Sequence, residues 1–237
     1  MMKTIKYIGK CLLIKEKGHK ILVVGDLHIG CGVKESAGII INKVLFEDMI
    51  KEFESVFSKI GKVDKIILLG DLKNDFSHLT EEERNGIVNL FDYLREKCIE
   101  IVIIRGNHDN YLLNLTSKRG LLIKDYYLFD SYCFLHGDKD FDEIYDKKIK
   151  YWIMGHIHPA IKLREGNKTE KYKCFLTGKF KGKRILILPS FADLREGIDI
   201  RGRDREMPWK FNLDEFDVRV VGEHLEVLSF GELRGIK

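Results

Sequence analysis

Residues 101–109 read IVIIRGNHD, and this stretch indicates the fold of the chain. Its first four residues are branched and apolar, which is typical of a strand buried in a sheet. After Arg105 and a glycine stand Asn107, His108 and Asp109, three side chains that can bind a metal or carry a proton. In open α/β sheets such residues gather at the carboxyl ends of strands. The stretch therefore predicts a strand that delivers polar groups to a site at one edge of a sheet.

The same arrangement of a short apolar run and metal-binding side chains occurs at four other places. These are residues 21–24 before Asp26 and His28, residues 66–69 before Asp71, residues 132–135 before His136, and residues 151–154 before His156 and His158. One such pattern is weak, because a Gly-Asp or a His-x-His pair often follows a strand by chance. Five in order along one chain predict a single polar site along one sheet edge.

Two helical patterns separate the first three of these strands. Apolar residues between positions 45 and 60 recur at helical spacing, and Gly61 is placed to end that helix. Thr80 and Glu83 have the spacing of a capping box, which predicts the start of a second helix that continues to about residue 98. Alternating strands and helices predict a largely parallel sheet covered by helices.

After residue 111 the pattern changes to short strands separated by glycine turns. The expected strands are residues 121–123, 132–135, 150–154, 172–176 and 184–188, and they predict a second, mostly antiparallel sheet. Residues 216–221 and 224–230, joined by Gly222 and Glu223, have the pattern of a final hairpin. Two sheets of this kind predict a sandwich with helices outside.

Length and composition fit one globular domain over residues 1–237, with a core at about 20–190 and a C-terminal loop and hairpin at 195–237. The 33% charged residues and the absence of glutamine resemble thermophile usage. A net charge of +4 is too mild to establish a nucleic-acid partner. Five scattered cysteines without a C-x-x-C pair, and charges that interrupt the apolar runs of the N-terminus, predict a cytoplasmic protein with no membrane partner.

The candidate ligands mix nitrogen and oxygen donors and include no thiolate. This mixture suits Mn, Fe, Zn, Co or Ni better than Mg or Ca. Seven ligands are too many for one tetrahedral ion, but they fit two ions about 3.5–4 Å apart, an arrangement used to cleave phosphate esters. The sequence therefore predicts two divalent transition-metal ions.

This ordered set of residues resembles the calcineurin-like metallophosphoesterase family over residues 20–190. The resemblance implies an α/β fold, a four-layer αββα sandwich of two mixed β-sheets flanked by helices. It implies that a bridging hydroxide attacks phosphorus in line, that His108 is the catalytic histidine, and that Asp109 orients it. It also implies two ligand sets that share Asp71: Asp26, His28, Asp71 and His158 for the first metal, and Asp71, Asn107, His136 and His156 for the second.

The segments GDLKNDF, RGNHD, HGD, GHIHP and LPSF are similar to those of small archaeal phosphoesterases related to the SbcD repair exonuclease and of bacterial phosphodiesterases associated with DNA ligase. That similarity implies a DNA-repair-related hydrolase. We therefore expect a two-metal phosphodiesterase, with manganese as the expected metal, that acts on nucleotides or nucleic acids, including a nuclease activity. The alternatives are a phosphomonoesterase or nucleotide phosphatase with the same site, and a non-catalytic scaffold of this fold.

Further residues are candidates for contact with a substrate. Asp75, His78 and Arg105 lie next to the predicted ligands. Residues 162–184 hold nine Lys or Arg and two Glu, which fits either a contact with the nucleic-acid backbone or, as we favour, a solvated basic hairpin. A homodimer is the default expectation for oligomeric state, since members of the family often pair.

Overall fold

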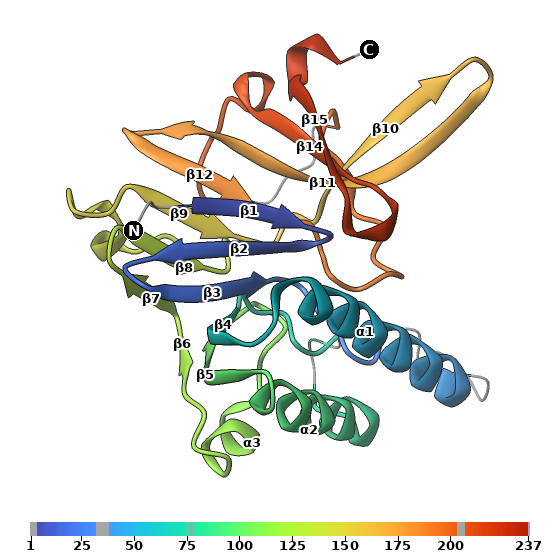
Figure 1. The fold of residues 1–237 in the computed structure, drawn as a ribbon, viewed down its shortest axis with the longest axis vertical. Helices are drawn as coiled ribbons and strands as arrows, with labels where there is room; N and C mark the ends of the chain where they lie inside the picture. The colour runs from blue at the N-terminus through green and yellow to red at the C-terminus, as the bar shows by residue number, and fades with distance from the viewer. Residues whose placement is uncertain (1–3, 32–37, 75, 77, 203–206, 237) are drawn as a thin grey trace.

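The computed structural model describes residues 4–31, 38–74, 76, 78–202 and 207–236. In this part of the chain two β-sheets pack face to face, with α-helices against the outer side of one of them (Figure 1). No described helix is long and apolar enough to span a membrane.

The first sheet has six strands in the order β1-β2-β3-β4-β5-β6. Strands β1 to β3 form antiparallel hairpins, and β3 to β6 run parallel as the alternating pattern predicted. The bounds are β1 (Thr4–Ile8), β2 (Cys11–Glu16), β3 (His19–Val24), β4 (Val63–Leu68), β5 (Cys98–Ile104) and β6 (Ile123–Lys124). Residues 121–123 were expected in the second sheet, and that prediction was wrong, because residues 123 and 124 pair with the end of β5 instead.

Three α-helices pack on the outer side of the first sheet: α1 (Gly38–Ile60), α2 (Glu81–Arg95) and α3 (Leu113–Ser117). Helix α1 begins several residues earlier than its apolar spacing predicted. Helix α2 begins where the sequence placed it, because Thr80 and Glu83 form the capping box in both directions. Apolar side chains of these helices and alternate residues of the strands, such as Leu22 and Val24, share one core cluster.

The second sheet has nine strands. Seven lie in the order β13-β10-β11-β12-β9-β8-β7, and β14 and β15 branch from β11. Most neighbouring strands are antiparallel, but β8, β9 and β12 run parallel in the centre. The bounds are β7 (Tyr126–Phe129), β8 (Tyr132–Leu135), β9 (Tyr151–Met154), β10 (Pro159–Glu165), β11 (Lys168–Phe180), β12 (Lys183–Ile187), β13 (Ile198–Asp199), β14 (Asp217–Val221) and β15 (Val227–Glu232).

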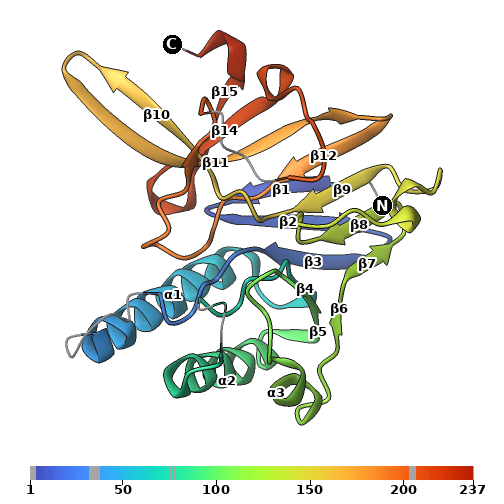
Figure 2. The same cartoon turned by 180° about the vertical axis from the view of Figure 1, so that it is seen from behind.

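Strand β10 was not predicted from the sequence. It pairs along its length with β11, and the two project from the sandwich as a long hairpin, which both views show (Figures 1 and 2). The predicted C-terminal hairpin is present as β14 and β15, and β14 joins β11, so the end of the chain completes the second sheet.

The outer layer on the second sheet differs from the expected α-helical layer. Among the described residues it consists of aromatic loop residues and short 3-10 helices, η1 (Asp142–Tyr145) and η2 (Leu213–Glu215). The indole ring of Trp209 packs on that of Trp152 of β9, with ring centroids 5.4 Å apart. Large rings cover this face without an α-helix among the described residues, so the sandwich is confirmed while the fourth layer is mostly irregular.

The two sheets meet through a third core cluster. It contains alternate residues of the first sheet, such as Ile21 and Val23, and facing residues of the second, such as Phe175 and Leu186. These side chains are almost completely buried. This close contact brings loops from both sheets to one edge of the sandwich.

Candidate metal centre

Loops that leave five strands converge at the carboxyl edge of the sandwich. Three belong to the first sheet and two to the second, as the strand-then-ligand pattern predicted. Asp26 and His28 follow β3, Asp71 follows β4, Asn107 and His108 follow β5, His136 follows β8, and His156 and His158 follow β9.

Five of these residues have a left-handed backbone. Their φ angles are 57° at Asp26, 42° at His28, 51° at Asp71, 73° at His156 and 43° at His158. Non-glycine residues are uncommon in this region, although Asp and His enter it more readily than most. The conformation turns the chain sharply after each strand and points these side chains back toward a common centre.

Glycines before the ligands allow the loops to approach closely. A Cβ atom on Gly106 would lie 2.2 Å from Oδ1 of Asp71, and one on Gly155 would lie 2.3 Å from Oδ2 of Asp26. Any larger residue at either position would displace a carboxylate of the site. This contact explains the Gly-Asn and Gly-His pairs of the sequence pattern.

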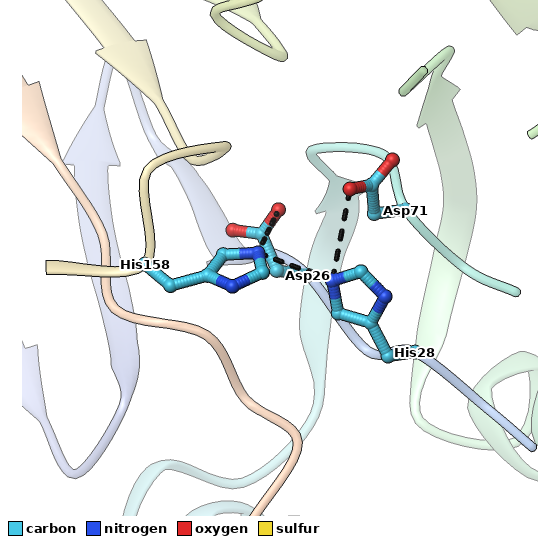
Figure 3. A group of neighbouring side chains, drawn as sticks. All are labelled: Asp26, His28, Asp71 and His158. Carbon is cyan, nitrogen blue, oxygen red and sulfur yellow. Dashed lines mark hydrogen bonds and ion pairs between the residues drawn. The ribbon is translucent and has the colours of Figure 1, made fainter. Parts of the chain in front are cut away.

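The first ligand set consists of Asp26, His28, Asp71 and His158, whose ligand atoms lie within 4.8 Å of one another (Figure 3). Nε2 of His28 is 3.1 Å from Nε2 of His158 and 3.6 Å from Oδ2 of Asp71. Nε2 of His158 is 3.3 Å from Oδ1 of Asp26. The two imidazoles and two carboxylates therefore aim their ligand atoms at one point.

The second ligand set lies on the other side of Asp71. Nε2 of His136 is 3.4 Å from Oδ1 of Asp71, 2.9 Å from Oδ1 of Asn107 and 3.1 Å from Nδ1 of His156. The two oxygens of Asp71 thus face different sets, as a bridging carboxylate requires. The structure brings the seven predicted side chains together around Asp71.

The donor chemistry of both sets fits divalent transition metals. Asp26, His28, Asp71 and His136 are almost fully buried, and Nδ1 of His28 has no hydrogen-bond partner among the described residues. Buried carboxylates and imidazoles with converging ligand atoms are costly unless a cation or a proton lies among them. Two mixed nitrogen and oxygen sets that share one carboxylate are suited to a pair of such ions.

Burial and neighbouring charges set the protonation of the metal-free site. Burial lowers the pKa of His28 to about 2, so its imidazole is neutral and needs no deprotonation to bind a metal. Burial, together with the charges of Asp26 and Asp109, raises the pKa of Asp71 to about 7 although His136 acts against this. Nδ1 of His136 lies 2.7 Å from the carbonyl oxygen of Leu69; as the donor there, it leaves Nε2 directed at the second set.

His108 lies beside the first set rather than in it. Its Nε2 is 3.8 Å from Oδ2 of Asp71, and its Nδ1 lies 2.6 Å from the backbone oxygen of Asn74. The exposed ring of Phe76 packs on its imidazole at a tilt of 31°, with centroids 3.6 Å apart. Burial lowers the pKa of His108 to about 4. The ring is thus held on two sides and presents one nitrogen to the centre.

Asp109 does not have the position expected of it. Its carboxylate accepts hydrogen bonds from the backbone N–H groups of Gly106 at 2.8 Å, Asp71 at 2.9 Å and Leu72 at 2.8 Å. The prediction that Asp109 orients His108 is therefore corrected, since Asn74 contacts that imidazole. Asp109 instead joins the loop after β5 to the loop after β4.

The other candidates for substrate contact have separate surroundings. Asp75 lies outside the described residues. His78 is exposed, and its carbonyl oxygen accepts a hydrogen bond from Nζ of Lys73. Arg105 faces Asp125, with 3.5 Å between Nη1 and Oδ1. Sequence reasoning missed Arg195, which follows the LPSF segment and donates a hydrogen bond to the side chain of Asn74.

Several basic residues of segment 162–184 have partners within the protein. Nζ of Lys173 donates to the carbonyl oxygens of Ser190 and Ala192, and Nζ of Lys183 donates to those of Asp146 and Ile149. Other lysines of the segment are exposed on the hairpin and the strand that follows it. Only part of its positive charge is therefore directed at solvent.

Comparisons with known proteins agree with this architecture. A family model described as calcineurin-like phosphoesterase matches residues 19–143, which is more than half of the chain. The crystal structure of nuclease MPE from Pseudomonas putida superposes with a TM-score of 0.61 at 17% identity, covering 93% of this chain and all of that one. The phosphoesterase YfcE from E. coli gives a TM-score of 0.39 at 14% identity, covering 86% of this chain and 88% of that one. A comparison with curated protein sequences found no match.

Proposed function

Since the chain belongs to the calcineurin-like phosphoesterase family, we propose that it is a two-metal phosphodiesterase that hydrolyses nucleotide or nucleic-acid diesters. The observation that carries the proposal is the convergence of the seven ligands around Asp71, with His108 beside them. A scaffold without activity would have no use for a histidine held by a backbone carbonyl and directed at this centre.

Bound divalent ions would supply ionisation of water near neutral pH and would offset the negative charge of the phosphoryl group. The mixed donor set favours manganese or a related transition metal over magnesium. Asp26, His28, Asp71 and His158 would hold one ion, and Asp71, Asn107, His136 and His156 the other.

His108 is the residue we assign to proton transfer. The backbone oxygen of Asn74 fixes its ring, so Nε2 faces the place where a substrate phosphate would lie. Burial lowers the pKa of His108 to about 4 in the metal-free site, so its imidazole is neutral there at neutral pH. A phosphate anion next to Nε2 favours the protonated form, which can then give its proton to the leaving oxygen.

The proposed preference for diesters over monoesters is supported by sequence similarity and by exposed positive charge near the site. The LPSF and GHIHP segments resemble those of nucleic-acid phosphodiesterases, and exposed lysines lie on the hairpin that begins directly after His158. A phosphomonoesterase with the same ligands is the second candidate. Burial of the ligands alone does not distinguish the two, so the substrate must be tested directly.

The test compares bis-p-nitrophenyl phosphate with p-nitrophenyl phosphate after Mn, Ni, Co, Zn or Mg is added to metal-free protein. We expect metal-dependent cleavage with a higher kcat/KM for the diester. His108→Ala should lower that value by about 10²- to 10⁴-fold without loss of bound metal. His224→Ala is the matched control, because that side chain is 91% exposed and outside the site.

Two results would contradict the proposal. Preference for the monoester would identify a phosphomonoesterase. Absence of hydrolysis with every metal, in protein shown by elemental analysis to hold two ions, would favour a scaffold.

A further inference from the structure

Arg195 stands on a loop that is tied to the turn of a metal ligand. Oγ of Ser190 donates to the carbonyl oxygen of Asp26 at 2.8 Å, and the N–H of Phe191 donates to that of Gly25 at 3.0 Å. The N–H of Arg195 donates to the carbonyl oxygen of Ala192, which closes the turn. The backbone of Arg195 is therefore fixed relative to the first ligand set.

The guanidinium of Arg195 shares a partner with His108. Its Nη2 donates to Oδ1 of Asn74, and the backbone oxygen of the same Asn74 contacts Nδ1 of His108. Asn74 is itself held, since its N–H lies 2.9 Å from Oε1 of the buried Glu83. One fixed residue thus places a cation beside the group that we assign to proton transfer.

The positive charge of Arg195 has no acidic partner among the described residues. Its Nε is buried without a hydrogen-bond partner in that part of the chain. A planar guanidinium with N–H groups to spare is suited to binding two oxygens of a phosphate.

We propose that Arg195 is a substrate-binding residue whose guanidinium donates hydrogen bonds to non-bridging oxygens of the phosphate that is hydrolysed. This inference rests on the proposed phosphoesterase function and names a residue outside its ligand set. Arg195 and the metal centre hold the phosphate from two sides, and His108 lies between them next to the leaving oxygen. Negative charge that develops on the phosphoryl oxygens is then stabilised by a group already in place.

The test uses Arg195→Gln and Arg195→Lys in full-length, Mn-loaded protein, with Arg201→Gln as the control. Arg201 is an exposed arginine, and its guanidinium contacts only the carbonyl of Lys162 among the described residues. Binding of inorganic phosphate is measured by calorimetry, kcat/KM with bis-p-nitrophenyl phosphate, and metal content by elemental analysis.

We expect Arg195→Gln to weaken phosphate binding and to lower kcat/KM by about 10- to 100-fold each, at unchanged metal content. Arg195→Lys should retain part of both, since it keeps the charge and loses the fork of donors. Guanidinium ion at millimolar concentration should restore part of the activity of Arg195→Gln, and an equal concentration of NaCl should not. A purely structural role for Arg195 would not give that rescue.

Unchanged phosphate binding in Arg195→Gln would overturn the inference. Loss of metal from that variant, or a defect seen only with oligonucleotides, would overturn it as well, because Arg195 would then support the fold or contact a neighbouring phosphate. The phosphate measurement also separates the two proposals. If wild-type protein binds phosphate through Arg195 but cleaves no diester, the proposed function fails and the inference stands.

Discussion

Neighbouring residues of the site have different tasks. His108 presents a nitrogen to the metal centre, while the carboxylate of Asp109 is buried against backbone N–H groups from two loops. The sequence identified both residues as important, but it could not show which one contacts which group. The partner of His108 is a backbone carbonyl, and a carbonyl has no signature in the sequence.

At this scale we predict that Asp109→Asn lowers stability. An amide in place of the carboxylate turns an N–H donor toward N–H groups that need an acceptor, so the free energy of unfolding should fall by about 1–3 kcal/mol. Urea denaturation measures this, with the exposed Asp92→Asn as the control. His108→Ala should instead keep its stability and lose its activity. If Asp109→Asn changed only the pH profile of kcat, the role of Asp109 as an orienting residue would be restored.

At the scale of elements, a residue in the first turn of helix α2 connects this helix to the loop of the site that follows β4. Glu83 completes the capping box with Thr80, and its carboxylate also contacts the N–H of Asn74 in the loop after β4. The start of this helix was predictable, because a capping box has a fixed spacing. Strand β10 was not predicted, although Ile161 and Leu163 alternate with Lys162 and Arg164 and pack in the core of the second sheet, because this alternation is too short to stand out.

We therefore expect Thr80→Ala to lower stability alone, and Glu83→Ala to lower both stability and activity. Thr80→Ala removes one cap and should cost about 1 kcal/mol of stability with kcat/KM nearly unchanged. Glu83→Ala also releases Asn74, so it should cost more, about 2–3 kcal/mol, and lower kcat/KM several-fold. Chemical denaturation and steady-state kinetics measure both effects. The control is Glu81→Ala in the same helical turn; equal kinetics for Glu83→Ala and this control would refute the link to the site.

At the scale of the whole molecule, the candidate metal centre joins the two sheets. Asp26, His28, Asp71 and Asn107 come from loops of the first sheet, and His136, His156 and His158 from loops of the second. The pattern of short strands allowed the two-sheet sandwich to be predicted, whereas the grouping of the candidate ligands was implied by the resemblance to the family. The outer layer on the second sheet was not predictable in this way, because the rings that cover it belong to irregular loops without periodicity.

Titration of Asp71 should lower the stability of the metal-free protein as the pH rises from about 6.5 to 8. The pKa of Asp71 is raised to about 7 in the fold and lies near 3.9 in an unfolded chain, so the folded state holds the extra proton and loses that advantage on deprotonation. His136, whose pKa is also raised by Asp71 and Asp26, acts in the same direction. His28 and His108 act in the opposite direction, because their pKa values of about 2 and about 4 in the fold lie below the value of about 6.5 in an unfolded chain, and each adds about 0.4 kcal/mol of stability over the same interval. The effect of Asp71 is therefore measured as the difference between wild type and Asp71→Asn.

The expected loss from Asp71 is about 1 kcal/mol over this interval. Urea denaturation in the presence of a chelator measures it, and Asp71→Asn should remove that part of the slope. Addition of manganese should raise the melting temperature in a concentration-dependent way and should flatten the pH dependence. A pH dependence that is the same in metal-free wild type and in Asp71→Asn would contradict this account.

The left-handed backbone at five ligand positions has a consequence for how the protein evolves. Each position would be relaxed by glycine, since that conformation costs other residues on the order of 1 kcal/mol. In a lineage that no longer needs the chemistry, a substitution to glycine would remove a ligand and relieve the backbone in one step. Keeping these side chains for catalysis therefore lowers the stability of the fold. Descendants that are no longer under selection for catalysis should lose these side chains early while keeping the sandwich.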